Sequence, residues 1–314
     1  MPSTLHRYEL DLAGLGVPVV EVTGAADGPT LTVLAGVHGC EYAPMAAVRR
    51  WSASLAARDL RGVVRAVPVL NLPAFRARSP FVLPEDGKNL NRCFPGDPAG
   101  TLADRLAHAA FSQLITGSDA LIDVHAGDLP EALEPFALYD TGVSEDRALD
   151  LAVAYGLGYV IRQAPGPGRA VSGSTSAAAA AAGIPAIIAE AGGCGLVEPA
   201  AVATHIRGLD AVLVALGMAD PGQGPAGPGT GGPGRGPVTL SQFIWLRCEH
   251  AGWWEPAVAT GESVRAGQLL GTVTSLDGAR MLQAITAPAD GVPMFITSSP
   301  AVDADGLLLG LGAR

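Results

Sequence analysis

The sequence predicts an α/β protein in which a mixed, mainly parallel sheet is flanked by helices and a small all-β domain follows. Over residues 1–216, apolar runs rich in branched side chains alternate with Ala- and Leu-rich stretches, as strands and helices do. Residues 217–238 are dominated by glycine and proline, which predicts a flexible linker. Residues 239–314 consist of short segments separated by turns, which predicts a β-rich C-terminal domain.

Four apolar runs in the first domain are predicted to be buried strands: residues 31–36, 63–70, 120–124 and 185–189. Helices are predicted over residues 44–57, 101–114, 147–155 and 174–182, and Ser or Thr begins two of them. Sheets of this kind present their functional sites beyond the carboxyl ends of the strands. The residues that follow each predicted strand are therefore the first candidates for a functional site.

Composition excludes several classes of protein. With 48% hydrophobic residues in 314, the chain can bury a large core and is not a disordered protein. The net charge of −10 leaves no basic stripe for nucleic acid. The N-terminus lacks the apolar core of a signal peptide, and no apolar run is long enough to span a membrane, so we expect a cytoplasmic protein without a membrane partner. The four cysteines show no CxxC spacing and are expected to be reduced.

Three predicted strands lead directly into residues that can carry chemistry. LTVLAGVHGCE reaches His38 and Glu41, ALIDVH reaches His125, and PAIIAE reaches Glu190. Two histidines and one glutamate leave a fourth position open for water, which is the pattern of catalytic rather than structural zinc. We expect one Zn²⁺ per chain, with Gly39 allowing the tight backbone between the first two ligands. Glu190 is then the candidate base that activates the attacking water.

Four motifs in order resemble the succinylglutamate desuccinylase/aspartoacylase family of zinc hydrolases, which is related to the metallocarboxypeptidases. They are GVHGCE, RARSP with DGKNLNRCFPG downstream, IDVHAGD and AEAGG, within residues 30–195. The resemblance implies a zinc carboxypeptidase-like fold. It also implies that His38, Glu41 and His125 hold the zinc and that Glu190 is the general base or acid.

The segment over residues 75–96 supplies cationic and amide groups. The resemblance implies that Asn91 and Arg92 bind the carboxylate of an N-acyl amino acid, for which the planar guanidinium is well suited. Arg78 is expected to stabilise the oxyanion beside the metal, although Arg76 lies only two residues away and spacing in this loop varies among relatives.

Other interpretations of this segment stay open. Asn89 could serve the turn rather than the substrate, and Arg92 could form a structural ion pair with Asp86 or Asp97. Glu190 could instead cap the turn that follows it.

Two residues beside the expected ligands add to the predicted site. Asp123 lies on the same strand face as His125 and could orient it as a hydrogen-bond acceptor. Cys40 stands where the family often has Asp or Asn, so its thiolate could compete for the metal or the side chain could pack inward; we favour packing.

The C-terminal segments WWEPAVATGESVRAGQLLGTV and ITAPADGVPMFI resemble the barrel-sandwich module of biotinyl and lipoyl domains. The only lysine of the chain is Lys88, far from the hairpin that would carry the cofactor, so a carrier function is rejected. We expect this domain to cap the site, to form a dimer contact or to restrict substrate size.

The expected function is zinc-dependent hydrolysis of the amide bond of a small N-acyl amino acid. The DGKNLNR segment and the C-terminal domain resemble ectoine-pathway deacetylases, which makes N-acetyl-diaminobutyrate a candidate substrate. A metallocarboxypeptidase acting on peptide C-termini, or a non-catalytic metal- or ligand-binding relative, are the alternatives. The sequence leaves the acyl group, the amino acid and the number of subunits open, a homo-oligomer included.

Overall fold

The structure, a computed structural model, describes residues 3–163, 172–222 and 236–314. Its N-terminal part contains strands β1 (Thr4–Leu12), β2 (Leu15–Thr23), β3 (Ala26–Ala35), β4 (Arg61–Val67), β5 (Ala120–His125), β6 (Glu131–Leu133), β7 (Phe136–Asp140), β8 (Tyr159–Gln163) and β9 (Ala186–Glu190). The helices are α1 (Tyr42–Ser54), α2 (Leu72–Ala77), α3 (Leu102–Ala110), α4 (Glu145–Tyr155), α5 (Thr175–Ala181) and α6 (Pro199–Ala215). The remaining strands are β10 (Val238–Leu240), β11 (Gln242–Arg247), β12 (Gly252–Pro256), β13 (Leu269–Thr274), β14 (Met281–Thr286), β15 (Gly291–Thr297), β16 (Ala301–Val302) and β17 (Leu307–Ala313).

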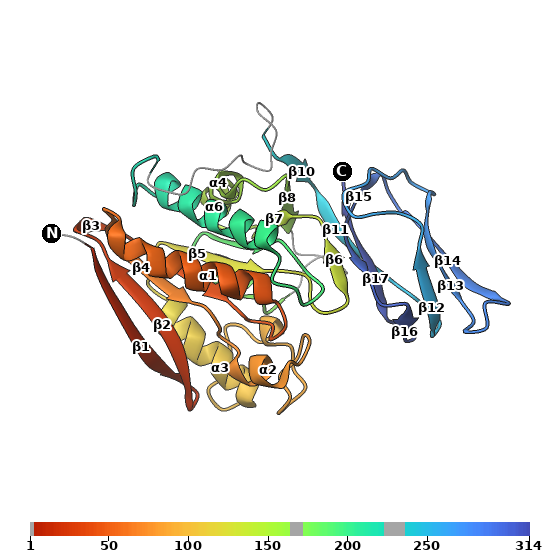
Figure 1. The fold of residues 1–314 in the computed structure, drawn as a ribbon, viewed down its shortest axis with the longest axis horizontal. Coiled ribbons are helices and arrows are strands. Elements are labelled where there is room, and N and C mark those ends of the chain that lie inside the picture. The colour runs from red at the N-terminus through yellow and green to blue at the C-terminus, as the bar shows by residue number, and fades with distance from the viewer. Residues whose placement is uncertain (1–2, 164–171, 223–235) are drawn as a thin grey trace.

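The large sheet has nine strands in the order β1-β2-β4-β3-β5-β9-β7-β8-β10. Strands β4, β3, β5 and β9 run parallel to one another at its centre, β7 is antiparallel to β9, and β1 and β2 form an antiparallel hairpin at one edge. Helices α1, α4 and α6 cover one face, and α2, α3 and α5 pack on the other (Figure 1). The predicted α/β fold class is confirmed.

Side-chain alternation along the central strands supplies both cores. On β3, Leu31, Val33 and Ala35 belong to the core under α1 and α6, whereas Leu34 belongs to the core under α3. Every one of these residues is fully buried. A strand covered on both faces must be apolar at successive positions, which is why these runs were recognisable in the sequence.

The predicted elements lie close to the observed ones. The four apolar runs correspond to β3, β4, β5 and β9, and the four Ala-rich stretches correspond to α1, α3, α4 and α5. The edge hairpin β1–β2, strands β7 and β8 and helix α6 were not predicted. In β1, charged and apolar residues are mixed, so this segment forms no apolar run. Strand β2 is mostly apolar, with Glu21 as its one charged residue, and was nonetheless not predicted.

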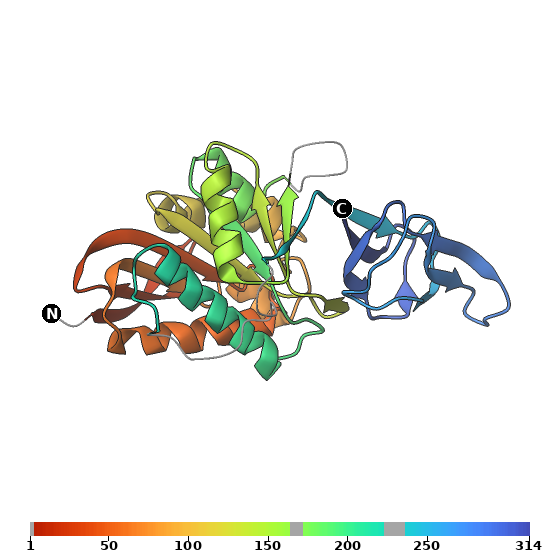
Figure 2. The same cartoon turned by 90° about the horizontal axis from the view of Figure 1, so that it is seen from above.

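The C-terminal part folds into two antiparallel sheets, β11-β17-β15-β6 and β14-β13-β12-β16. Its own core lies between them and includes Trp254, Val273, Leu308 and Leu311. Both sheets lie beyond one end of the large sheet (Figures 1 and 2). The predicted small β domain is therefore present.

The two parts exchange strands. Strand β10, which begins at the predicted end of the linker, pairs with β8 in the large sheet. Conversely, β6 from the N-terminal part pairs with β15 of the C-terminal part. Most of the predicted linker, residues 223–235, lies outside the described residues. Backbone hydrogen bonds thus fix the C-terminal sheets against the larger domain.

Among the described residues, none of the helices combines the length and the apolar character that a membrane span requires.

Candidate active site

His38 and Glu41 lie on the loop that joins β3 to α1. Gly36 adopts a left-handed φ of +68° where the chain leaves the strand. Gly39 does not; a Cβ there would lie 2.3 Å from the backbone carbon of Ala74, so this glycine permits the close approach of α2. Glycine is needed at position 39, as expected, but because there is no space for a side chain and not because of the backbone angle.

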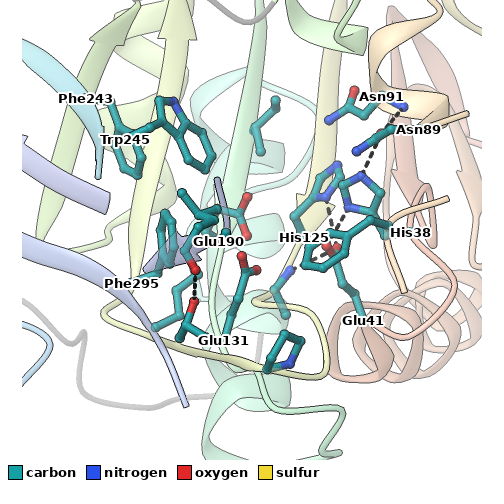
Figure 3. A pocket seen from close by; sticks show the side chains of 18 of the residues that line it. His38, Glu41, Asn89, Asn91, His125, Glu131, Glu190, Phe243, Trp245 and Phe295 are labelled. Atoms are coloured by element: carbon teal, nitrogen blue, oxygen red, sulfur yellow. Dashed lines mark hydrogen bonds and ion pairs between the residues drawn. The ribbon is translucent and has the colours of Figure 1, made fainter. Parts of the chain in front are cut away.

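The three expected ligands converge on one point. The Nδ1 atom of His38 lies 2.6 Å from Glu41 Oε1, and the Nδ1 atom of His125 lies 2.9 Å from Glu41 Oε2. One donor atom from each residue lies within 4.8 Å of the others, and all three side chains are buried. The backbone N–H of Ala126 also donates to Glu41 Oε2 at 3.2 Å. Figure 3 shows both imidazole rings facing the Glu41 carboxylate.

The far nitrogen of each imidazole faces an oxygen acceptor. His38 Nε2 lies 3.1 Å from Asn89 Oδ1, and His125 Nε2 lies 2.9 Å from Asp123 Oδ2, as a close ionic contact without hydrogen-bond alignment. The Asn89 acceptor favours a proton on Nε2 of His38, and the negative charge of Asp123 favours one on Nε2 of His125; both arrangements direct Nδ1 towards a cation. Two imidazoles and one carboxylate, buried and directed to one point, fit a Zn²⁺ ion.

The charge balance of the cluster favours a cation. Burial alone would raise the pKa of Glu41, but His125 and His38 outweigh it and hold this pKa at about 2. Burial opposes protonation of His125, yet Asp123 and Glu41 raise its pKa well above the usual value. The histidines thus keep Glu41 ionised, and the carboxylates of Glu41 and Asp123 stabilise positive charge at His125.

Glu190 ends β9 directly beside His125 on β5, because the two residues are partners in the parallel ladder. Its Oε2 atom is buried and has no hydrogen-bond partner among the described residues. Burial raises the pKa of Glu190 to about 8, with the negative charges of Glu41 and Glu131 adding to the effect. A carboxylate with a pKa near neutrality and a free oxygen can accept and release a proton.

The cluster opens into a cavity of about 1060 Å³ that both parts of the chain line. Asn91 and Arg92 lie in its wall. Asn91 Oδ1 accepts from the backbone N–H of Thr175 at 3.0 Å, which orients the amide and leaves its Nδ2 to donate elsewhere.

Arg92 presents an exposed guanidinium to this cavity and forms no ion pair with any described carboxylate, Asp86 and Asp97 included. Its Nη1 donates to the backbone oxygen of Asn91 at 2.8 Å, and desolvation lowers the pKa of Arg92. A guanidinium in a cavity that has no ion-pair partner is available to an anionic ligand.

Arg78 lies elsewhere. It ends α2 with a left-handed φ of 54°, its side chain is exposed, and it does not line the cavity; Arg76 is also exposed. The structure therefore brings together six of the seven expected site residues and places Arg78 outside the group.

Cys40 is fully buried and does not belong to the ligand cluster. Its thiol lies 3.8 Å from the Tyr42 hydroxyl, and burial raises the pKa of the thiol. The side chain packs inward.

Asn89 serves the turn, as one interpretation of the sequence expected, by accepting from the backbone N–H of Asn91 at 2.8 Å; it also contacts His38. Two other features of the cavity were not singled out from the sequence. Glu131 lines the cavity beside Glu190, and Phe243, Trp245 and Phe295 form an aromatic wall (Figure 3). Glu131 stands six residues after His125 in a segment without periodicity, so only its closeness to a motif could have marked it.

Comparisons with known proteins agree with this site. The family model of the succinylglutamate desuccinylase/aspartoacylase catalytic domain matches residues 27–216. The chain is 33% identical over 258 residues to the N-alpha-acetyl-L-2,4-diaminobutyric acid deacetylase of Halomonas elongata, a match that covers 81% of this chain and 73% of that protein.

Solved structures share the fold over nearly the whole chain. The product-bound ectoine utilization protein EutE of Ruegeria pomeroyi superposes with a TM-score of 0.83 at 22% identity, covering 100% of this chain and 96% of that one. A succinylglutamate desuccinylase of a Silicibacter species gives a TM-score of 0.80 at 26% identity, covering 98% and 94%. The extent of these matches, with the four motifs in order, establishes that the chain belongs to the succinylglutamate desuccinylase/aspartoacylase family.

Proposed function

We propose that this protein is a zinc-dependent amidohydrolase that removes the acyl group from a small N-acyl amino acid. The observation that carries the proposal is a single cavity that contains the His38–Glu41–His125 cluster, the carboxylate of Glu190 and the unpaired guanidinium of Arg92. These are a metal site, a proton acceptor and a binding group for an anion.

His38, Glu41 and His125 would hold the zinc. When bound, zinc supplies a Lewis acid that polarises a carbonyl and makes water more acidic. Arg92 and the free amide N–H of Asn91 bind the substrate carboxylate and so fix the position of the scissile amide.

Glu190 takes the proton of the attacking water and passes it to the nitrogen of the leaving amine. Its free Oε2 atom and its pKa of about 8 suit both steps, because a group near neutrality exchanges protons in either direction. The products are the carboxylate of the acyl group and the free amino acid.

The name of the Halomonas elongata relative specifies acetyl as the acyl group and 2,4-diaminobutyric acid as the amino acid. The same compound is our first candidate substrate. The C-terminal sheet closes one side of the cavity with Phe243, Trp245 and Phe295, which supports a small substrate over the C-terminus of a long peptide.

The test combines metal analysis with a substrate panel. We expect about one zinc per chain and hydrolysis of one class within a panel of N-acetyl, N-succinyl and N-formyl amino acids, with a blocked tripeptide as the peptidase control. Glu190→Gln removes the proposed base and should lower kcat by about 10²- to 10⁴-fold.

A matched control is Glu198→Gln, because Glu198 is an exposed glutamate outside the cavity. Turnover by Glu190→Gln at the parent rate would disprove the assignment of the base. Turnover of the tripeptide alone would make the protein a carboxypeptidase, and zinc binding without any turnover would make it a binding protein.

A further inference from the structure

Glu131 is a carboxylate in the cavity that the proposed reaction does not use. It begins β6, whose pairing with β15 places Glu131 opposite Thr297 and fixes its backbone in the C-terminal sheet. Its side chain is half-buried, and Oε2 accepts the backbone N–H of Asp128 at 3.0 Å. No described lysine, arginine or histidine forms an ion pair with it. A desolvated carboxylate without a cation is costly, so a ligand that supplies one is stabilised there.

The aromatic wall stands on the same side of the cavity as Glu131 (Figure 3). Phe243 and Trp245 lie two apart on β11 and have ring centroids 5.0 Å apart; the Trp245 and Phe295 centroids are 5.3 Å apart. The intervening strand β17 has Gly310 opposite both Trp245 and Phe295, where a Cβ would lie 2.2 Å from the Phe295 ring. The absence of a side chain at this glycine lets the rings close over β17.

Of the three rings, Phe243 and Phe295 are buried and Trp245 is half-buried, so the indole is the ring most accessible from the cavity. Indole faces attract cations. The C-terminal part also offers Arg247 to the cavity, but its guanidinium donates to the backbone oxygen of Asp305 at 2.7 Å.

Apart from Arg247, whose guanidinium lies 3.9 Å from the Asp305 carboxylate, the basic and acidic groups named here lie in different parts of the cavity. Asn91, which precedes Arg92 in the chain, lies near the imidazoles, whereas Glu131 lies beside Glu190, towards the aromatic wall of the C-terminal sheet (Figure 3). A matching ligand has a carboxylate at one end and a positive charge at the other.

We propose that Glu131, with the Trp245 indole in the same cavity, determines specificity by binding an ammonium group on the side chain of the acylated amino acid. The inference rests on the proposed function, because it assumes that the substrate carboxylate lies at Arg92. It assigns to Glu131 a role in substrate choice and none in bond cleavage.

The test compares two substrates that differ only in the ammonium group, Nα-acetyl-2,4-diaminobutyrate and N-acetyl-2-aminobutyrate. We expect the parent to prefer the first in kcat/KM. We expect Glu131→Gln to reduce that preference by about 10- to 100-fold, as loss of a charge-assisted hydrogen bond does, with little change for the neutral substrate. Trp245→Leu should reduce it by about 2- to 5-fold.

The matched control is Glu134→Gln, since Glu134 lies near Glu131 in sequence, is half-buried and does not line the cavity. In Glu131→Gln the side-chain amide oxygen can still accept the backbone N–H of Asp128. Thermal unfolding verifies that this variant is folded. An equal loss for both substrates, or no preference in the parent, would overturn the inference.

If the parent hydrolyses neither of these two nor any member of the acyl amino acid panel, the proposed function fails, and calorimetry still decides on Glu131. Free 2,4-diaminobutyrate should then bind the zinc-loaded parent more tightly than 2-aminobutyrate, and the difference should vanish in Glu131→Gln alone. Equal binding of the two amino acids by the parent would refute the ammonium site.

Discussion

The contact between Asp123 and His125 gives the sharpest prediction about the metal site. Asp123 is fully buried, and its Oδ2 lies 2.9 Å from His125 Nε2 while it accepts the Thr175 hydroxyl. Two unit charges at this separation would attract by about 6 kcal/mol at an effective dielectric constant of about 20. A metal-bound imidazole carries only part of a charge, and Asp123 has lost its hydration, so the net effect is smaller.

We therefore expect Asp123→Asn to weaken zinc binding by about 10- to 100-fold, the loss typical of acceptors behind metal-binding histidines. This corresponds to about 1.4–2.7 kcal/mol. The assay is competition for zinc against a chelator of known affinity at neutral pH, with thermal unfolding of the metal-free proteins alongside.

Asp140→Asn is a closely matched control. Asp140 is also buried and also accepts a hydroxyl of α5, that of Ser176 at 2.6 Å, but it does not touch a ligand. Zinc affinity should be unchanged in this variant. Equal affinities in Asp123→Asn and the parent, or equal losses in both aspartate variants, would refute the reasoning.

The remaining predictions concern three other parts of the structure. Arg92→Lys should raise KM for acyl amino acids by about 10-fold through loss of the bidentate pair, whereas Arg78→Lys, outside the cavity, should change steady-state kinetics little. In the metal-free protein, the pKa of about 8 at Glu190 lies above the ordinary 4.5, so the parent loses stability as the pH rises from about 4.5 to 8. Glu190→Gln should accordingly raise the melting temperature at pH 8 more than at pH 5, and equal shifts would contradict the pKa. Gly310→Ala should destabilise by about 1–3 kcal/mol in denaturant titration because the new Cβ overlaps an aromatic ring. Gly158→Ala, which meets nothing within 4 Å, should be close to neutral.

The centre of the large sheet and the His38–Glu41–His125 cluster could be predicted from the sequence. Strands β3, β5 and β9 are apolar on both faces, and each leads into His38, His125 or Glu190, so adjacency of parallel strands brought these residues together. The proximity of His38 and Glu41 was also predictable, because two side chains three positions apart on one turn can reach a common point. The family resemblance added Asn91 and Arg92.

Other parts of the site depend on contacts between distant segments. Glu131, Trp245 and Phe295 lie far apart in the sequence and line one cavity because β6 pairs with β15, and β17 joins β15 to β11. The sequence spacing could not show that Arg78 lies outside the cavity. Its position at the surface follows from the left-handed turn that ends α2. Long-range strand pairing and loop geometry have no periodic signal in the sequence. The members of the His38–Glu41–His125 cluster were therefore predictable, whereas the groups proposed to choose the substrate became visible only in the fold.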